Sequence, residues 1–186
     1  MARLPDPTAG LSTADREAFD HMAGARAGAE GRAALGDVYV RMFNNPAVAR
    51  AVGALGEHLR FAGVLPGDAR ELAILRYAAG QGFGYVWAHH RGPARQAGIP
   101  DDAVAALAGD GVPKGLAPSR RAVVEAVDAV AARRSIPAEV QDRLEGAFGR
   151  PGVVELVALC GLYALMGYTV TAFDVELEEG FPRPPF

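Results

Sequence analysis

The 186-residue chain has a single cysteine, Cys160, and no large excess of charge of either sign. One cysteine excludes an internal disulfide, so nothing in the composition indicates an oxidising compartment. The formal net charge of −3 argues against nucleic-acid binding, which usually requires a basic face. The first residues, MARLPDPTAGLST, contain no apolar core of a secretion signal. We therefore expect a soluble cytoplasmic protein that does not bind nucleic acid.

The sequence also lacks the spacings that mark a metal site or a phosphate-binding loop. His89 and His90 are adjacent, which is a poor spacing for two ligands on one helical face, and no His-x-x-x-His or Glu-x-x-His pattern surrounds His90. Gly80, Gly82 and Gly84 follow a predicted helix rather than a strand, so the context of a dinucleotide-binding loop is missing. We expect no metal and no cofactor.

What the chain has in abundance is helix-forming sequence. Half of its residues are hydrophobic, alanine is frequent, and runs of β-branched residues are few, which together predict an all-α protein. We expect an N-terminal arm over 1–12, one domain over 13–176 and an irregular, proline-rich tail over 177–186. Eight or nine helices are expected, over about 13–27, 32–43, 46–62, 70–79, 85–97, 100–108, 119–134, 137–149 and 151–174.

Two helix starts have recognisable caps. Asn45 followed by Pro46 is typical of a helix N-terminus, and Ser119 is expected to cap the helix that follows it. Apolar periodicity in the helix after Pro46 predicts the residues that face the core. These are Val48, Val52, Leu55 and Leu59.

The last predicted helix admits two interpretations. Residues 153–173 contain one charged residue, Glu155, and the stretch is long enough to cross a bilayer. Two tyrosines, two threonines and an acidic rather than basic C-terminal flank argue against a membrane span. A helix that is apolar all round is also typical of one buried between subunits. We favour a buried helix at a subunit contact and no membrane.

The most informative stretch is residues 70–98, RELAILRYAAGQGFGYVWAHHRGPARQAG. It predicts two helices that meet at a glycine-rich corner and pack antiparallel as a central hairpin over about 68–97. Glu71 lies about 11 residues before the corner and His90 about 8 after it, roughly 16 and 12 Å along the helices. The carboxylate and the imidazole are therefore expected to meet directly or through one water.

The spacing in this hairpin resembles the carboxymuconolactone decarboxylase and alkylhydroperoxidase D superfamily. Its redox branch has a glutamate, then a Cys-x-x-Cys pair beginning twelve residues later, then a histidine four residues after the second cysteine. Glu71 and His90 match the glutamate and the histidine, whereas Phe83 and Val86 stand where the cysteines would be. Since neither side chain can act as a thiolate, the chain should not be a dithiol peroxidase.

A decarboxylase-like branch of the same superfamily has a pattern close to Tyr-Glu-Trp-x-x-His. Tyr85, Trp87 and His90 match it, with Val86 in place of the glutamate. The resemblance implies an AhpD-like all-α fold, homo-oligomers that are typically trimers or hexamers, and pockets between helices near subunit contacts.

Three functional hypotheses follow. The first is a cofactor-free lyase-like enzyme in which His90 is the general acid and base and Glu71 its partner, acting on a small carboxylated, lactone or carbonyl-bearing molecule. The second is a non-catalytic ligand-binding oligomer on the same fold. The third is a peroxidase-like activity that uses Cys160, which is disfavoured because this cysteine lies among apolar helix residues and is expected to be a core residue.

The pocket around the pair is expected to be apolar and aromatic. His89 points about 100° away from His90 on a helix, so we expect only one of the two, His90, to face the pocket. An arginine such as Arg76 would bind a substrate carboxylate through a bidentate contact. The expected substrate-binding residues are Tyr85, Trp87, Phe83, Val86, His89 and Arg76.

Overall fold

The computed structural model describes residues 4–30, 35–109 and 111–186, and within these ranges it contains helices and no strand. Helices hold 72% of the chain, so the predicted all-α fold is confirmed. The elements are η1 (Thr8–Gly10), α1 (Thr13–Glu30), α2 (Asp37–Met42), α3 (Pro46–Glu57), η2 (His58–Ala62), α4 (Gly67–Gln81), α5 (Gly84–Gln96), α6 (Asp101–Leu107), α7 (Pro118–Ala131) and α8 (Ala138–Phe173).

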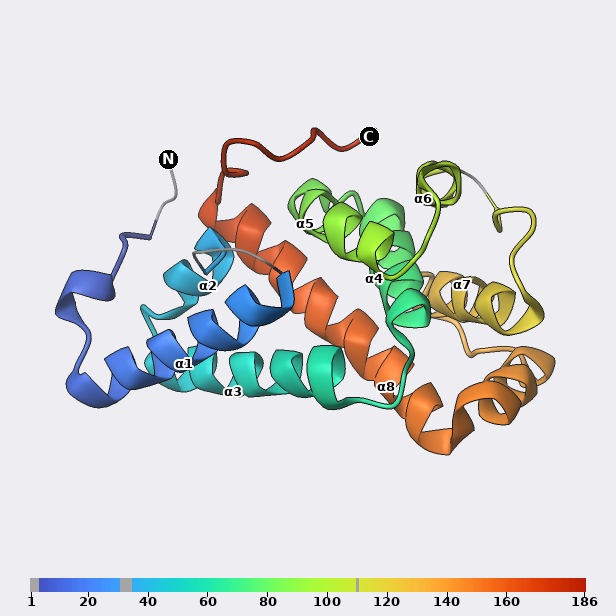
Figure 1. Ribbon diagram of the computed structural model, residues 1–186, viewed down its shortest axis with the longest axis horizontal. Helices are drawn as coiled ribbons and strands as arrows, with labels where there is room; N and C mark the ends of the chain where they lie inside the picture. Colours follow the sequence, from blue (N-terminus) through green and yellow to red (C-terminus); the bar gives the residue numbers. More distant parts are fainter. Residues whose placement is uncertain (1–3, 31–34, 110) are drawn as a thin grey trace.

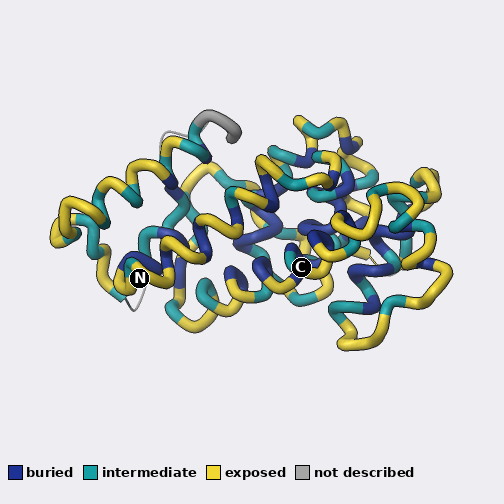
Figure 2. Tube along the Cα trace, turned by 90° about the horizontal axis from the view of Figure 1, so that it is seen from below, coloured by how far each residue is buried: buried dark blue, intermediate teal, exposed yellow. Residues whose placement is uncertain are grey.

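The long helix α8 runs through the molecule, with α1, α2 and α3 gathered at one end and α4 to α7 at the other (Figure 1). α4 packs against α5, α7 and α8, and α8 also contacts α2, α3, α5 and α7. Figure 2 shows the buried segments concentrated inside this arrangement, whereas α1 is mostly exposed or half-buried. The core therefore lies where α4, α7 and α8 meet.

The corner between α4 and α5 is built by one glycine. Gly82 ends α4 in the left-handed conformation, with φ 68° and ψ 24°, which glycine adopts without steric cost. The amide of Phe83 donates to the Ala78 carbonyl, and α5 begins one residue later. This short corner turns the chain back on itself, so that α4 and α5 pack along one another.

α8 contains a break that explains the two helices predicted here. Gly149 has φ 68° and ψ 171°, which is outside the helical region, and Pro151 follows in the next turn. The single charge of the apolar segment, Glu155, is used internally, because its carboxylate accepts hydrogen bonds from the amides of Val64 and Leu65. This contact ties the loop before α4 to α8.

Several sequence-based expectations for individual helices differ from the structure. Val48 and Leu55 on α3 are 46% and 43% exposed rather than buried, because the described residues pack only the other side of this helix. Ser119 lies inside α7, which starts at Pro118 without a side-chain cap. The helix predicted over 32–43 forms only as α2, and residues 32–34 lie outside the described part of the chain. The Asn45 cap is present, since its side chain accepts from the Val48 amide.

Gly167 on α8 offers a test of how tightly the corner packs. A Cβ at this position would overlap the Phe83 ring, so we expect Gly167→Ala to lower the free energy of unfolding by about 1–3 kcal/mol, as overpacking does. Gly146 on α8 is exposed and has open space around it. There the same change should raise stability by about 0.5–1 kcal/mol, as alanine does in a helix. Denaturant unfolding of both variants measures the difference, and a neutral Gly167→Ala would contradict the packing.

Candidate active site

Glu71 on α4 and His90 on α5 form a buried carboxylate–imidazole pair. Glu71 Oε2 and His90 Nδ1 are 2.7 Å apart, and the two residues are 1% and 5% exposed. Because the two residues lie on opposite sides of the Gly82 corner, this contact requires the helices to run antiparallel. The meeting expected from the spacing is therefore direct and involves no bridging water.

The surroundings keep the Glu71 carboxyl ionised. Burial alone would raise its pKa, but the charge and hydrogen bond of His90, followed by the charges of Arg60 and Arg70, outweigh burial and lower the pKa below its usual range. Arg70 Nε also donates to Glu71 Oε1 at 3.3 Å. An ionised Glu71 accepts the proton on His90 Nδ1, which leaves Nε2 as the nitrogen on the other side of the ring.

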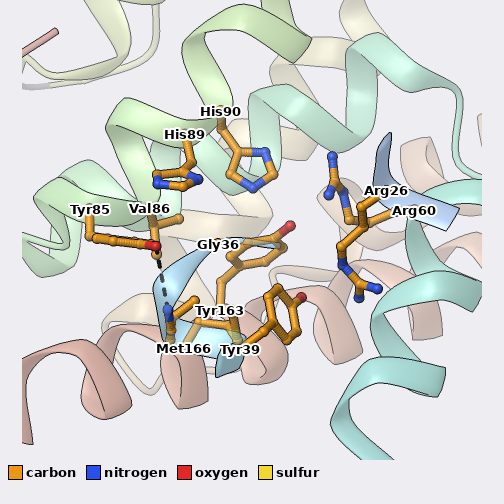
Figure 3. A pocket seen from close by; sticks show the side chains of 11 residues that line it. Arg26, Gly36, Tyr39, Arg60, Tyr85, Val86, His89, His90, Tyr163 and Met166 are labelled. Atoms are coloured by element: carbon orange, nitrogen blue, oxygen red, sulfur yellow. Dashed lines mark hydrogen bonds between the residues drawn. The ribbon is translucent and has the colours of Figure 1, made fainter. Parts of the chain in front are cut away.

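A cavity lies beside this pair, lined by residues of α1, α2, η2, α5 and α8. The cavity has a volume of about 40 Å³, which is enough for a few waters. Figure 3 shows both imidazoles of α5 pointing into it. The lining residues are Arg26, Gly36, Val38, Tyr39, Arg60, Tyr85, Val86, His89, His90, Tyr163 and Met166.

Two of the cavity residues are buried arginines. Arg26 from α1 and Arg60 from η2 are only 4% and 7% exposed. The Arg26 guanidinium lies over the Tyr39 ring at 4.3 Å and donates to the Met22 and Gly53 carbonyls. No local pattern in the sequence indicates that Arg26 or Arg60 reaches this cavity. The site therefore has more positive charge than the sequence suggested.

The expectation that only one histidine faces the cavity is wrong. His89 lines it together with His90, and its Nε2 lies 2.7 Å from Glu178 Oε2. Glu178 belongs to the segment after α8, and its Oε1 accepts from the Tyr85 hydroxyl at 2.7 Å. No sequence pattern predicts a role for this glutamate, since it stands in a proline-rich tail.

Three predicted substrate-binding residues do not line the cavity. Arg76 is bound on the far side of α4, where it forms a bidentate ion pair with Asp128 and donates to two backbone carbonyls. Phe83 packs edge-on against Tyr168, and its ring lies over Gly167. Trp87 is 1% exposed and serves the core. Tyr85, Val86 and His89, by contrast, line the cavity, and their binding of a substrate stays a prediction.

Cys160 does not belong to the site. It is 2% exposed on α8, is absent from the cavity lining, and burial raises its pKa to about 12. The thiol therefore stays protonated at neutral pH, which removes the physical basis for its use as a nucleophile.

Sequence comparison supports the assignment suggested by this geometry. A model of the carboxymuconolactone decarboxylase family matches residues 46–129, which include Glu71, His90 and the corner between them. Over this part, the chain is similar to the carboxymuconolactone decarboxylase family. No curated protein matches it in sequence.

Several solved structures have the same fold. The debrominase Bmp8, both without ligand and as a cysteine-to-alanine variant in complex with 2,3,4-tribromopyrrole, superposes with a TM-score of 0.74 at 17% identity, over 91% of this chain and 90% of that one. A protein of unknown function from Agrobacterium tumefaciens, suggested to be the antioxidant defence protein AhpD, gives a TM-score of 0.65 at 19% identity, over 74% and 94%. At these identities the likeness shows the fold alone.

The contacts of Glu178 predict how the stability of the fold depends on pH. Burial opposes ionisation of Glu178, but hydrogen bonds from His89, the Asp37 amide and Tyr85 prevail and lower its pKa from 4.5 to about 2. Because the folded-state pKa is the lower one, ionised Glu178 stabilises the fold fully above about pH 4.5 and loses this effect as the pH falls through about 2.

We therefore expect the unfolding temperature of the parent chain to exceed that of Glu178→Gln at pH 7, and this difference to shrink toward pH 2. Thermal unfolding at a series of pH values measures it. Glu179→Gln, at the exposed neighbouring position, is the matched control and should show no such trend. A difference for Glu178→Gln that is constant with pH would contradict the assignment.

Proposed function

We propose that this protein is a cofactor-independent enzyme that moves a proton on a small carboxylated, lactone or carbonyl-bearing molecule, by decarboxylation or a related reaction. The observation that carries the proposal is the 2.7 Å contact between ionised Glu71 and His90 beside a cavity. A histidine oriented by a carboxylate is a general acid and base at neutral pH. The match of residues 46–129 to the carboxymuconolactone decarboxylase family supports decarboxylation or a related proton transfer.

The geometry supports separate roles for the two residues. Glu71 holds the Nδ1 proton of His90 and makes Nε2 the atom that reacts. In a decarboxylation the C–C bond to the carboxylate breaks, its electron pair passes into the neighbouring carbonyl as an enolate, and CO2 leaves. Protonated Nε2 then donates its proton to the enolate carbon. The reverse transfer, from a carbon next to a carbonyl to Nε2, uses the same arrangement.

The buried arginines fit an anionic substrate. Arg26 and Arg60 reach the cavity beside His90, and a guanidinium binds carboxylate or enolate oxygens through paired N–H donors. Tyr163 packs edge-on against the His90 ring at 4.9 Å and restricts its rotation. The free space in the cavity is smaller than such a substrate, so substrate binding requires side chains in its wall to move.

The alternatives have less support. A dithiol peroxidase needs two thiols near the corner, and the chain has Phe83 and Val86 at these positions. A ligand-binding protein without activity would use the same cavity, but it would gain nothing from a carboxylate that orients the reactive nitrogen of His90. A measurement of substrate turnover distinguishes a ligand-binding protein from an enzyme.

His90→Ala and Glu71→Gln are the direct tests. A panel of small carboxylic acids and lactones, with carboxymuconolactone and 2,3,4-tribromopyrrole among them, is first screened by thermal shift and then by product analysis. On the compound that is converted, each change should lower kcat by about 10²-fold or more, because a general acid–base group is lost. A compound that binds without conversion would favour the ligand-binding alternative.

A surface histidine provides the control for this experiment. His21 pairs with Glu57, but its side chain is 71% exposed and lies outside the cavity. His21→Ala should leave kcat unchanged. Full activity in both His90→Ala and Glu71→Gln would remove the assignment. A circular dichroism spectrum of each variant verifies that the helices are retained.

We also propose that the protein works as a cytoplasmic homo-oligomer, a trimer or hexamer. α8 is the one helix among the described residues that is long and apolar enough to cross a membrane, and 44% of its most apolar window is buried within the chain. The side of α8 left uncovered by the chain carries Val154, Val157, Leu165 and Tyr168, which are 38–68% exposed. A second copy would bury this stripe as a subunit contact, in keeping with the superfamily.

Val154→Glu tests the contact, since Val154 is the most exposed member of the stripe at 68%. Light scattering after gel filtration should give a trimer or hexamer for the parent chain and a smaller species for the variant, because a charge cannot be buried there unpaired. Ala147→Glu, at an exposed position of α8 before the Gly149 break, should keep the parent mass. A monomeric parent chain would contradict the proposal.

A further inference from the structure

The segment after α8 contributes a side chain, Glu178, that binds two residues of the cavity wall, Tyr85 and His89. Glu178 reaches two elements at once, because its Oε1 accepts from the Tyr85 hydroxyl at 2.7 Å and from the Asp37 amide at 2.9 Å, while its Oε2 contacts His89 Nε2 at 2.7 Å. This single carboxylate therefore holds the start of α2, the middle of α5 and the C-terminal segment together.

The His89 ring is restrained on both faces as well as at its edge. It stacks on Tyr85 with ring centres 4.2 Å apart and planes inclined by 19°, and on Phe181 at 4.2 Å and 11°. A Cβ at Gly36 would lie 3.4 Å from His89 Cε1, so the chain also approaches the ring from α2. The imidazole is thus fixed in one orientation at the cavity.

Further contacts dock the C-terminal segment along α5. Phe186 meets the Trp87 ring edge-on at 5.4 Å, and Pro184 packs so closely on Gly84 that a Cβ there would be 2.7 Å from its Cγ. Val175, at the start of the segment, is buried. In Figure 1 this segment leaves the end of α8 and runs back past α5. Glu178 is therefore held in place by contacts on either side of it.

The cavity consequently has two adjacent histidines, each bound by its own carboxylate from a different part of the chain. We propose that Glu178 is a positioning residue that holds His89 as a second acid–base group of the site, next to His90. This inference rests on the proposed function of the cavity. It makes the C-terminal segment a part of the active site rather than an appendage.

Two such groups suit a reaction in which a proton leaves one atom of the substrate and another arrives elsewhere. One histidine accepts the first proton while the other, already protonated, donates the second, so the protein's total number of protons is unchanged after the step. The titratable and charged groups that face His89 are Glu178 from the C-terminal segment, Tyr85 and His90 from α5, and Asp37 at the start of α2. The pH dependence of turnover must be interpreted with all of them.

The test compares Glu178→Gln with its exposed neighbour, Glu179→Gln. The measurement is NMR of full-length protein with 15N-labelled histidine. The proton on His89 Nε2 should give a downfield, hydrogen-bonded signal in the parent chain and in Glu179→Gln. This signal should be lost in Glu178→Gln. This readout needs no substrate. The absence of the signal from the parent chain, or its persistence in Glu178→Gln, would overturn the proposal.

Kinetics on the converted compound provide the second arm. Glu178→Gln and His89→Asn should each lower kcat about 10-fold or more and alter the pH profile, whereas Glu179→Gln should do neither. The double variant should be no slower than His89→Asn alone, because Glu178 acts through His89. Additive losses would overturn the proposal, as would a kcat for Glu178→Gln equal to that of Glu179→Gln.

Trp87 is the only tryptophan of the chain, so its fluorescence reports whether the C-terminal segment stays docked in each variant. If the segment is released in Glu178→Gln, the comparison of His89→Asn with the double variant is made under conditions where the fluorescence shows the C-terminal segment docked. If His90→Ala and Glu71→Gln keep full activity, the proposed function fails whatever the NMR result. If these two lose activity and Glu178→Gln does not, only the present inference fails.

Discussion

The buried carboxylate of Glu71 is the constraint on which the site depends. An ionised carboxyl group that is 1% exposed is costly unless charges and hydrogen bonds compensate it. His90 provides both, and Arg60 and Arg70 add charge from neighbouring positions. The same contact that fixes α4 against α5 therefore sets the tautomer of His90. Structure and chemistry are not separable here, since removing either partner leaves a buried polar group without its counterpart.

Much of this arrangement could be predicted from local sequence. Helical periodicity, the Asn45 cap and the glycine corner act within a few residues, and two positions at similar distances from a corner must face each other when the helices pack. This is why Glu71 and His90 could be paired across 19 positions of sequence. The break in α8 at Gly149 was readable for the same reason, because glycine followed by proline interrupts a helix locally.

The remainder of the site depends on partners that local patterns do not specify. Arg26 reaches the cavity because α1 packs on α3. Glu178 reaches Tyr85 and His89 because the chain turns back after α8. Arg76 was a plausible ligand for a substrate carboxylate until Asp128, 52 positions away, proved to bind it. Helical periodicity likewise predicted that Val48 and Leu55 face the core, but the described residues leave both side chains exposed. Such contacts between distant segments carry no signal in composition or spacing.

The two positions where the redox branch has cysteines limit the chemistry that is available at this corner. Val86 is 3% exposed in the cavity wall, and Phe83 fills the space against Gly167. Val86 presents an apolar side chain to the cavity beside His90, and a lower local dielectric strengthens the interaction of His90 with Glu71. Phe83 packs outside the cavity, so only the residue at position 86 changes the polarity of its wall. Because neither side chain is a thiol, the carboxylate–imidazole pair is what this part of the chain retains of the redox branch's polar groups.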